Sequence, residues 1–177
     1  MLVAERVRER DQTFGLTPVA VGTIFTVGLV ISTALANPYR QPGPLSENIG
    51  VADFGERGTL NVSRRWETYI NSLQATAYGS GFRAGTPLID LTGGTPGAAL
   101  VLDATAPGTP WLARSSPDPS TFAVTSLNNA DCLALSQAWL LVQPDNPQAI
   151  PESEVLASFG ASWPDDYVVV GTIPGPF

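Results

Sequence analysis

The sequence predicts an α+β protein in which one N-terminal transmembrane helix precedes a small extracytoplasmic domain with short strands and about three helices. Three observations lead to this fold class. Residues 14–36 form an uncharged apolar run, only 14% of the 177 residues are charged, and 16 prolines and 17 glycines interrupt the chain. Because proline and glycine favour turns, we expect brief elements joined by many loops after the apolar run.

The apolar run at residues 14–36 is longer than the roughly 20 residues that a helix needs to cross the hydrocarbon of a bilayer. Its end, Ala34-Leu35-Ala36, has the small-residue form of a signal-peptide cleavage site. A signal peptide, however, has an apolar region of only about 7–15 residues. We therefore expect an uncleaved anchor rather than a cleavable signal.

Arginines determine the expected orientation of the anchor. Arg6, Arg8 and Arg10 precede the run, whereas only Arg40 follows it closely. Positively charged flanks stay in the cytoplasm, which predicts an anchor in the bacterial inner membrane with the rest of the chain in the periplasm. The expected organisation is a cytoplasmic N-terminus at residues 1–13, a transmembrane helix at 14–36, a Pro/Gly-rich linker at 37–50 and a periplasmic α+β domain at 51–177.

Small residues recur at four-residue spacing within the anchor. The candidate helix-packing residues are Gly22, Thr26, Gly28, Ser32 and Ala36. Small side chains let a second helix approach closely, so this pattern predicts lateral packing against a partner helix. The alternative is a surface that faces lipid alone, because small residues are common in membrane helices in general.

The outer domain is expected to begin with two short extended pieces in residues 51–62, joined by a turn at 55–58. A helix is predicted at residues 63–78, because Ser63 can cap its start and glycines follow its end. Its expected buried stripe consists of Trp66, Tyr69, Ile70, Leu73 and Ala77.

Two short apolar runs follow this helix, at residues 85–91 and 98–102. They fit two strands, or a strand followed by a short helix, and residues 109–113 fit one further strand.

The last third of the chain contains three patterns. Residues 129–142 have apolar positions at helical spacing, and residues 151–160 begin with proline and acids and end with glycine, as a short helix does. Residues 167–173, YVVVGTI, are the best strand pattern in the chain because β-branched residues dominate them.

Asp90, Gly93 and Gly94 form the candidate ligand site or turn. An acid at a strand end before a glycine turn can serve as a base, and Asp103 would be the second acid of a cation site. The structural alternative is that the Asp90 carboxylate hydrogen-bonds the backbone of the turn that follows it. With no histidine in the chain and no second acid close in sequence, we expect Asp90 to be non-catalytic.

The composition excludes most catalytic machinery. The chain has no histidine, no lysine and a single cysteine, Cys132, so the commonest general base, the usual zinc ligands and a P-loop lysine are missing. Cys132 follows an acid that would raise a thiol pKa, and we expect it to be a buried structural residue. The net charge of −7 is unsuited to binding nucleic acid. We expect no enzymatic activity, no metal and no cofactor.

Several stretches resemble a known kind of membrane protein. Residues 81–112, together with NPYRQP after the apolar run, AWLLVQPDNP and FGASWPDDY, are similar to the last transmembrane helix plus periplasmic C-terminal domain of uncharacterised multi-pass bacterial membrane proteins. The resemblance covers most of the chain. It implies a periplasmic location for the outer domain and no particular activity.

These features predict a non-catalytic, single-pass accessory subunit of a larger bacterial inner-membrane complex, such as a photosynthetic reaction-centre, light-harvesting or respiratory complex. Its expected partners are other membrane-protein subunits, contacted through the helix and the periplasmic domain, and the lipid bilayer. The alternative is a membrane-anchored envelope enzyme or carbohydrate-binding module that uses Asp90.

Overall fold

The computed structural model describes residues 2–38, 43–94, 97–112 and 118–176, with side chains from Pro18 onward. The chain divides into two compact units, Met1–Ile49 and Gly50–Phe177, and each is described by itself. The second unit mixes helices with strands, which confirms the mixed helix-and-strand class predicted from the sequence.

The first unit consists of one long helix and a short turn of helix. Helix α1 (Leu2–Ala36) continues through Pro18, and the 3-10 helix η1 (Leu45–Glu47) follows in the same unit. At 1.5 Å per residue, the 35 residues of α1 extend for roughly 50 Å, which is well beyond the 30 Å of a bilayer core. The helix therefore includes the arginine-rich residues before the apolar run.

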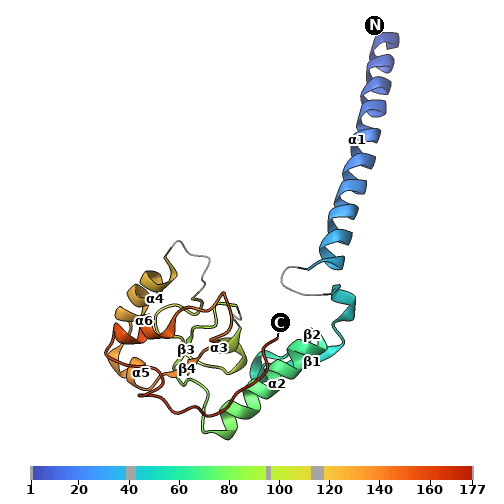
Figure 1. Cartoon of the computed structure of the whole chain (residues 1–177). Coiled ribbons are helices and arrows are strands. Elements are labelled where there is room, and N and C mark those ends of the chain that lie inside the picture. The colour runs from blue at the N-terminus through green and yellow to red at the C-terminus, as the bar shows by residue number, and fades with distance from the viewer. Residues whose placement is uncertain (1, 39–42, 95–96, 113–117, 177) are drawn as a thin grey trace. The chain divides into compact units, whose positions relative to one another are not determined.

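The second unit begins with an antiparallel hairpin that lies along a helix (Figure 1). Strands β1 (Gly50–Asp53) and β2 (Thr59–Val62) pair with Gly50 opposite Val62, and η2 (Gly55–Arg57) makes the turn between them. Helix α2 (Arg64–Gly79) follows, and Glu67 on α2 accepts a hydrogen bond of 3.2 Å from the backbone N–H of Val51 on β1. The predicted extended pieces and helix are confirmed.

The stripe predicted for this helix is also confirmed. Trp66 is partly buried and meets Tyr69 edge to face, with ring centroids 5.7 Å apart. The fully buried members are Tyr69, Ile70, Leu73 and Ala77. Ser63 occupies the N-cap position, as predicted. Its buried hydroxyl makes no hydrogen bond with any described residue, so the expected capping bond is absent.

The remaining elements surround a two-stranded parallel sheet. Strand β3 (Leu88–Asp90) pairs with β4 (Trp139–Leu141), with Leu88 opposite Trp139. Four short helices accompany the sheet, α3 (Ala98–Val101), α4 (Pro119–Asn128), α5 (Cys132–Ser136) and α6 (Glu152–Ala157). Of the two arrangements that the sequence left open for residues 85–102, the strand followed by a short helix is the correct one.

Neighbouring residues of β3 point into different hydrophobic cores. Leu88 belongs to a core built by α2, Phe82 and α3, whereas Ile89 belongs to a core built by α4, Ile150 and α6. Because side chains alternate along a strand, β3 contributes to both cores at once. Strand β4 does the same, since Trp139 packs on the first core and Leu140 on the second.

Several sequence predictions for the second unit are wrong. The helix expected at residues 129–142 is instead the short α5 followed by β4, because the apolar positions of its second half pair with β3. Residues 167–173 form no strand, and neither do residues 109–112; residue 113 lies outside the described chain. Helix α4 was missed, and α2 to α6 exceed the three helices expected.

Replacing Phe82 by alanine should lower the free energy of unfolding by about 3–5 kcal/mol, because Phe82 is fully buried and its ring meets Trp139 edge to face at 5.2 Å. Chemical denaturation followed by tryptophan fluorescence measures this loss. The matched control is Phe122→Ala on α4, where the ring is exposed and the loss should stay below about 1 kcal/mol. Equal losses at the two positions would contradict the assignment of Phe82 to the core.

Candidate functional site

The turn that follows β3 contains the acid and glycines singled out in the sequence. Asp90 ends β3, and its Oδ1 accepts hydrogen bonds from the backbone N–H of Thr92 at 3.0 Å and from the Thr92 hydroxyl at 2.6 Å. An aspartate that binds the backbone two residues later forms an Asx turn. The Asp90 carboxylate therefore hydrogen-bonds the backbone of the turn that follows it, as the structural alternative for this residue expects.

The glycines of this turn permit a close approach between two chain segments. Gly93 has a φ of +65° and is buried against the backbone carbonyl of Gln148, where a Cβ atom would collide with that oxygen. Gly94 is buried beside it. Only glycine takes this backbone conformation without strain and leaves the space empty.

The opposing segment is tied to the turn by hydrogen bonds. The Asn146 side-chain amide donates to the Thr92 carbonyl at 3.0 Å, and the Ile150 N–H donates to the Leu91 carbonyl at 2.9 Å. Asn146 also accepts from the Gln148 N–H at 3.0 Å, which shapes its own segment. Asp90, Gly93 and Gly94 are thus brought together, in a turn whose backbone is held from both sides.

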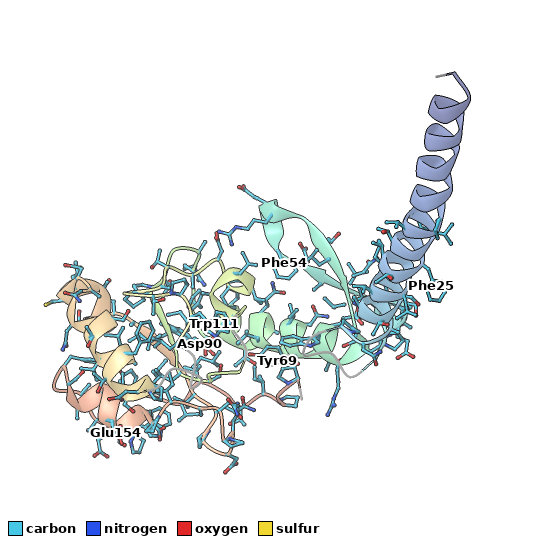
Figure 2. The ribbon with its side chains drawn as sticks, turned by 90° about the horizontal axis from the view of Figure 1, so that it is seen from above. Phe25, Phe54, Tyr69, Asp90, Trp111 and Glu154 are labelled. Carbon is cyan, nitrogen blue, oxygen red and sulfur yellow. The ribbon has the colours of Figure 1, made fainter. Side chains whose placement is uncertain are left out.

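Burial affects the charge of Asp90. The side chain is mostly shielded from solvent and lies within the body of the second unit (Figure 2). Burial raises the pKa of Asp90 from 3.8 to about 6, and the two hydrogen bonds from Thr92 offset part of that rise. Near neutral pH the carboxylate is ionised at a cost in folding free energy.

The second acid proposed for a cation site has a different partner. Asp103 binds Arg57, with 2.6 Å between its Oδ1 and Nη2, and Arg57 also donates to the Leu100 carbonyl at 3.2 Å. This pair lies in an open groove of about 720 Å³ between the β1–β2 turn, α2 and α3. In the chain that the structure describes, no group of three or more Asp, Glu, Cys or His side chains converges as a metal site would require.

Cys132 was expected to be buried, and this prediction is wrong. It is the first residue of the short helix α5 and is exposed beside a hollow of about 290 Å³ whose other lining residues include Asp166 and Tyr167. Helix α5 spans only Cys132–Ser136 and contains no buried residue, and the chain then joins the sheet.

The apolar part of α1 is the most extended hydrophobic surface of the described chain. Residues Pro18–Ala36 have a mean hydropathy of 2.1, and all of them are exposed, including Phe25 in Figure 2. This is the one described helix that is long and apolar enough to cross a membrane. A signal sequence has the same two properties.

Three threonine hydroxyls in this stretch are hydrogen-bonded within the helix. The hydroxyl of Thr23 donates to the Val19 carbonyl at 2.9 Å, that of Thr26 to Gly22 at 2.8 Å, and that of Thr33 to Leu29 at 2.8 Å. Of the candidate packing residues, Gly22 and Gly28 have open space where a Cβ would lie, and Ser32 and Ala36 are exposed. An apolar environment can therefore surround this stretch without leaving a threonine hydroxyl unpaired.

A second apolar surface was missed as a site. Residues 168–170 are three exposed valines in the segment for which the sequence predicted a strand. The signal was present in the sequence as YVVVGTI, but a strand pattern does not reveal whether the chain provides a pairing partner.

A comparison with protein-family models found no match, and neither a curated protein nor a solved structure matches the chain. The structure itself defines a mixed helix-and-strand protein with one apolar N-terminal helix.

Replacing Asp90 by asparagine should stabilise the protein at pH 7, by an amount on the order of 2–3 kcal/mol, because the variant avoids the cost of a buried charge. The folded-state pKa lies above the usual value, so the cost is absent below about pH 4 and complete above about pH 6. The stability difference between variant and wild type should therefore grow as the pH rises through this window. Urea denaturation at a series of pH values measures it.

Asp118→Asn is the matched control for this experiment. The side chain of Asp118 caps α4 by accepting from the Thr121 N–H. Hydrogen bonds with the side chain and then the backbone of Thr121 lower the pKa of Asp118. Its contribution has the opposite sign, present at neutral pH and lost on acidification, so this substitution should not stabilise the protein at pH 7. A difference between Asp90→Asn and wild type that is independent of pH would contradict the burial of the Asp90 charge.

Proposed function

We propose that this chain is a non-catalytic, single-pass accessory subunit of a larger bacterial inner-membrane complex of the photosynthetic reaction-centre, light-harvesting or respiratory kind. The helix at Pro18–Ala36 anchors it, the N-terminus lies in the cytoplasm, and the outer domain stabilises neighbouring subunits on the periplasmic side. The observation that supports the proposal most strongly is the complete exposure of this apolar helix, whose large side chains find no described partner in the chain.

The chemistry of the helix supports an anchor that packs against another helix. Its threonine hydroxyls are internally satisfied, and the sites of Gly22 and Gly28 leave room for a neighbouring backbone. In lipid, association of helices depends on such close packing rather than on a hydrophobic driving force. The arginines at positions 6, 8 and 10 support the proposed orientation.

The outer domain supports a role in contact rather than in catalysis. Asp90 is engaged with Thr92, Asp103 is engaged with Arg57, and the glycine turn is filled by the approach of Gln148. Exposed apolar side chains also occur on separate segments of this unit, among them Trp111, Leu133 and Val168.

One observation favours a second candidate, an envelope enzyme or carbohydrate-binding module that uses Asp90. A carboxyl group with a pKa of about 6 can hold or release a proton near neutral pH, as a general acid or base must. Asp90→Asn keeps an oxygen that accepts the Thr92 bonds but cannot exchange a proton. This second candidate therefore requires that Asp90→Asn abolish the cellular phenotype of the chain while leaving its fold intact.

Purification of the full chain from membranes in a mild detergent should yield stable companions that are themselves integral membrane proteins, identified by mass spectrometry. Gly28→Leu combined with Ser32→Leu should remove or strongly deplete these companions, because the larger side chains block close helix approach. Val30→Leu enlarges an exposed position of the same span and should leave the companions in place. A chain that purifies alone as a stable monomer would refute the accessory role.

Cys132 provides a direct test of orientation, because it is the single cysteine of the chain and is exposed. A membrane-impermeant maleimide should label it in intact spheroplasts as completely as in lysed ones. The Cys132→Ser variant, which cannot react, gives the background signal. Labelling that requires lysis would place the outer domain in the cytoplasm and overturn the proposed topology.

A further inference from the structure

Residues 168–170 are three consecutive valines on the surface of the second unit. Their side chains are 87%, 60% and 46% exposed, in order. Scattered apolar side chains are normal on a protein surface, but three β-branched residues in a row are the composition of a strand.

The segments on both sides of these valines are held in place. Before them, the Tyr167 N–H donates to the Pro164 carbonyl at 3.1 Å, and Asp166 accepts from the Ser162 N–H at 2.8 Å. After them, Gly171 lies so close to Thr76 of α2 that a Cβ would come within 2.5 Å of its methyl group, and Pro176 is buried. The C-terminal trace passes along α2 in Figure 1. Both ends of the valine segment are therefore fixed, which reduces the entropy that a partner must remove on binding.

The backbone of this segment lacks partners. Within the part of the chain that the structure describes, no hydrogen bond reaches the backbone of residues 168–176. Unpaired N–H and C=O groups beside exposed β-branched side chains are what an added strand binds, with the backbone providing affinity and alternate side chains providing selectivity.

Charge indicates which partner fits. From residue 118 to residue 177 the sequence contains no arginine or lysine. Its charged residues are all acids, namely Asp118, Asp131, Asp145, Glu152, Glu154, Asp165 and Asp166. Two of them, Asp165 and Asp166, are exposed and lie just before the valine segment, separated from it by Tyr167. A second copy of the chain would bring the same negative charge, whereas a basic segment is attracted and correctly oriented.

We propose that residues 168–170 are a docking edge to which a basic, extended segment of a partner protein adds as a β-strand. The inference rests on the proposed accessory role and identifies the surface and the chemistry of one contact made by the outer domain. Backbone pairing along the valines holds the partner, and its arginines or lysines face the acids that precede them.

The test uses the full chain in a neutral detergent and three synthetic peptides. The first alternates valine and threonine and carries arginines at both ends, the second replaces each arginine by glutamate, and the third is the basic peptide with every second amide N-methylated. Calorimetric titration should detect binding of the basic peptide alone, and binding should weaken as salt is added. Failure of the basic peptide to bind, or equal binding of the acidic or N-methylated peptide, overturns the proposal.

Variants of the chain locate the binding to the valine segment. Val169→Pro removes a backbone N–H and Val169→Lys adds a repelling charge while keeping the backbone, and each should raise the dissociation constant by about tenfold or more. Val169→Thr keeps the backbone and the branched shape and should bind nearly as wild type does. Leu133→Lys is the matched control, since Leu133 is also apolar, is 63% exposed and lies in the same acidic part of the chain. An equal effect of Leu133→Lys would show that charge alone attracts the peptide and would overturn the docking edge.

Three further outcomes distinguish the docking edge, its basic partner and the accessory role from one another. Self-association of the chain that depends on Val169 and grows with salt would assign the segment to a second copy and overturn the basic partner. Loss of peptide binding in a chain that retains its membrane companions refutes the docking edge alone. A chain that binds the basic peptide but has no membrane companions refutes the accessory role alone.

Discussion

The parallel pairing of β3 with β4 is the interaction on which the second unit depends. Three residues of each strand pair, and alternation along them sends Leu88 toward one core and Ile89 toward the other. The two cores share no other sheet in the described chain. Without this pair, α2 with its hairpin and α4 with α6 would each keep a partial core that buries too little apolar surface for independent stability. The many short elements around the sheet are stable because they pack on it, since helices of four to ten residues are marginal alone.

The Asp90 turn is a consequence of this arrangement. It begins where β3 ends, and the chain must there turn away from the sheet while the segment before α6 returns to it. Three features make this geometry possible. The Asx turn of Asp90 bends the chain, the positive φ of Gly93 allows the approach of Gln148, and the amide of Asn146 binds the Thr92 carbonyl. This arrangement buries the Asp90 carboxylate, which lowers the folding stability when the group is ionised and raises its pKa. The turn holds the segment before α6 against the end of β3 in the second unit, and the alternative role of Asp90 in proton transfer depends on its raised pKa.

Local patterns predicted the local elements, and the misses involve partners distant in sequence. The helix α2 was predictable because its cap, its apolar stripe and its glycine end all lie within one segment. The strand β4 was not, because the apolar spacing of residues 133–141 fits a helix equally well until the pairing of Trp139 with Leu88 is known. The strand predicted at residues 167–173 was wrong for the opposite reason. These residues have a high strand propensity, but no described strand pairs with them. Asp90, Gly93 and Gly94 could be grouped from sequence, whereas their contacts with Asn146 and Gln148 could not, because the Asn146 bond to Thr92 joins positions 54 residues apart.

The C-terminal segment that packs on α2 affects when the chain can fold during its synthesis. Ile173 and Gly171 pack against a helix made roughly a hundred residues earlier, and Trp139 packs on Phe82, which is made about 57 residues before it. Contacts between residues so far apart in sequence form late. The first core therefore stays incomplete until the ribosome has added Trp139, and the growing chain lacks part of this core until Ile173 has been made.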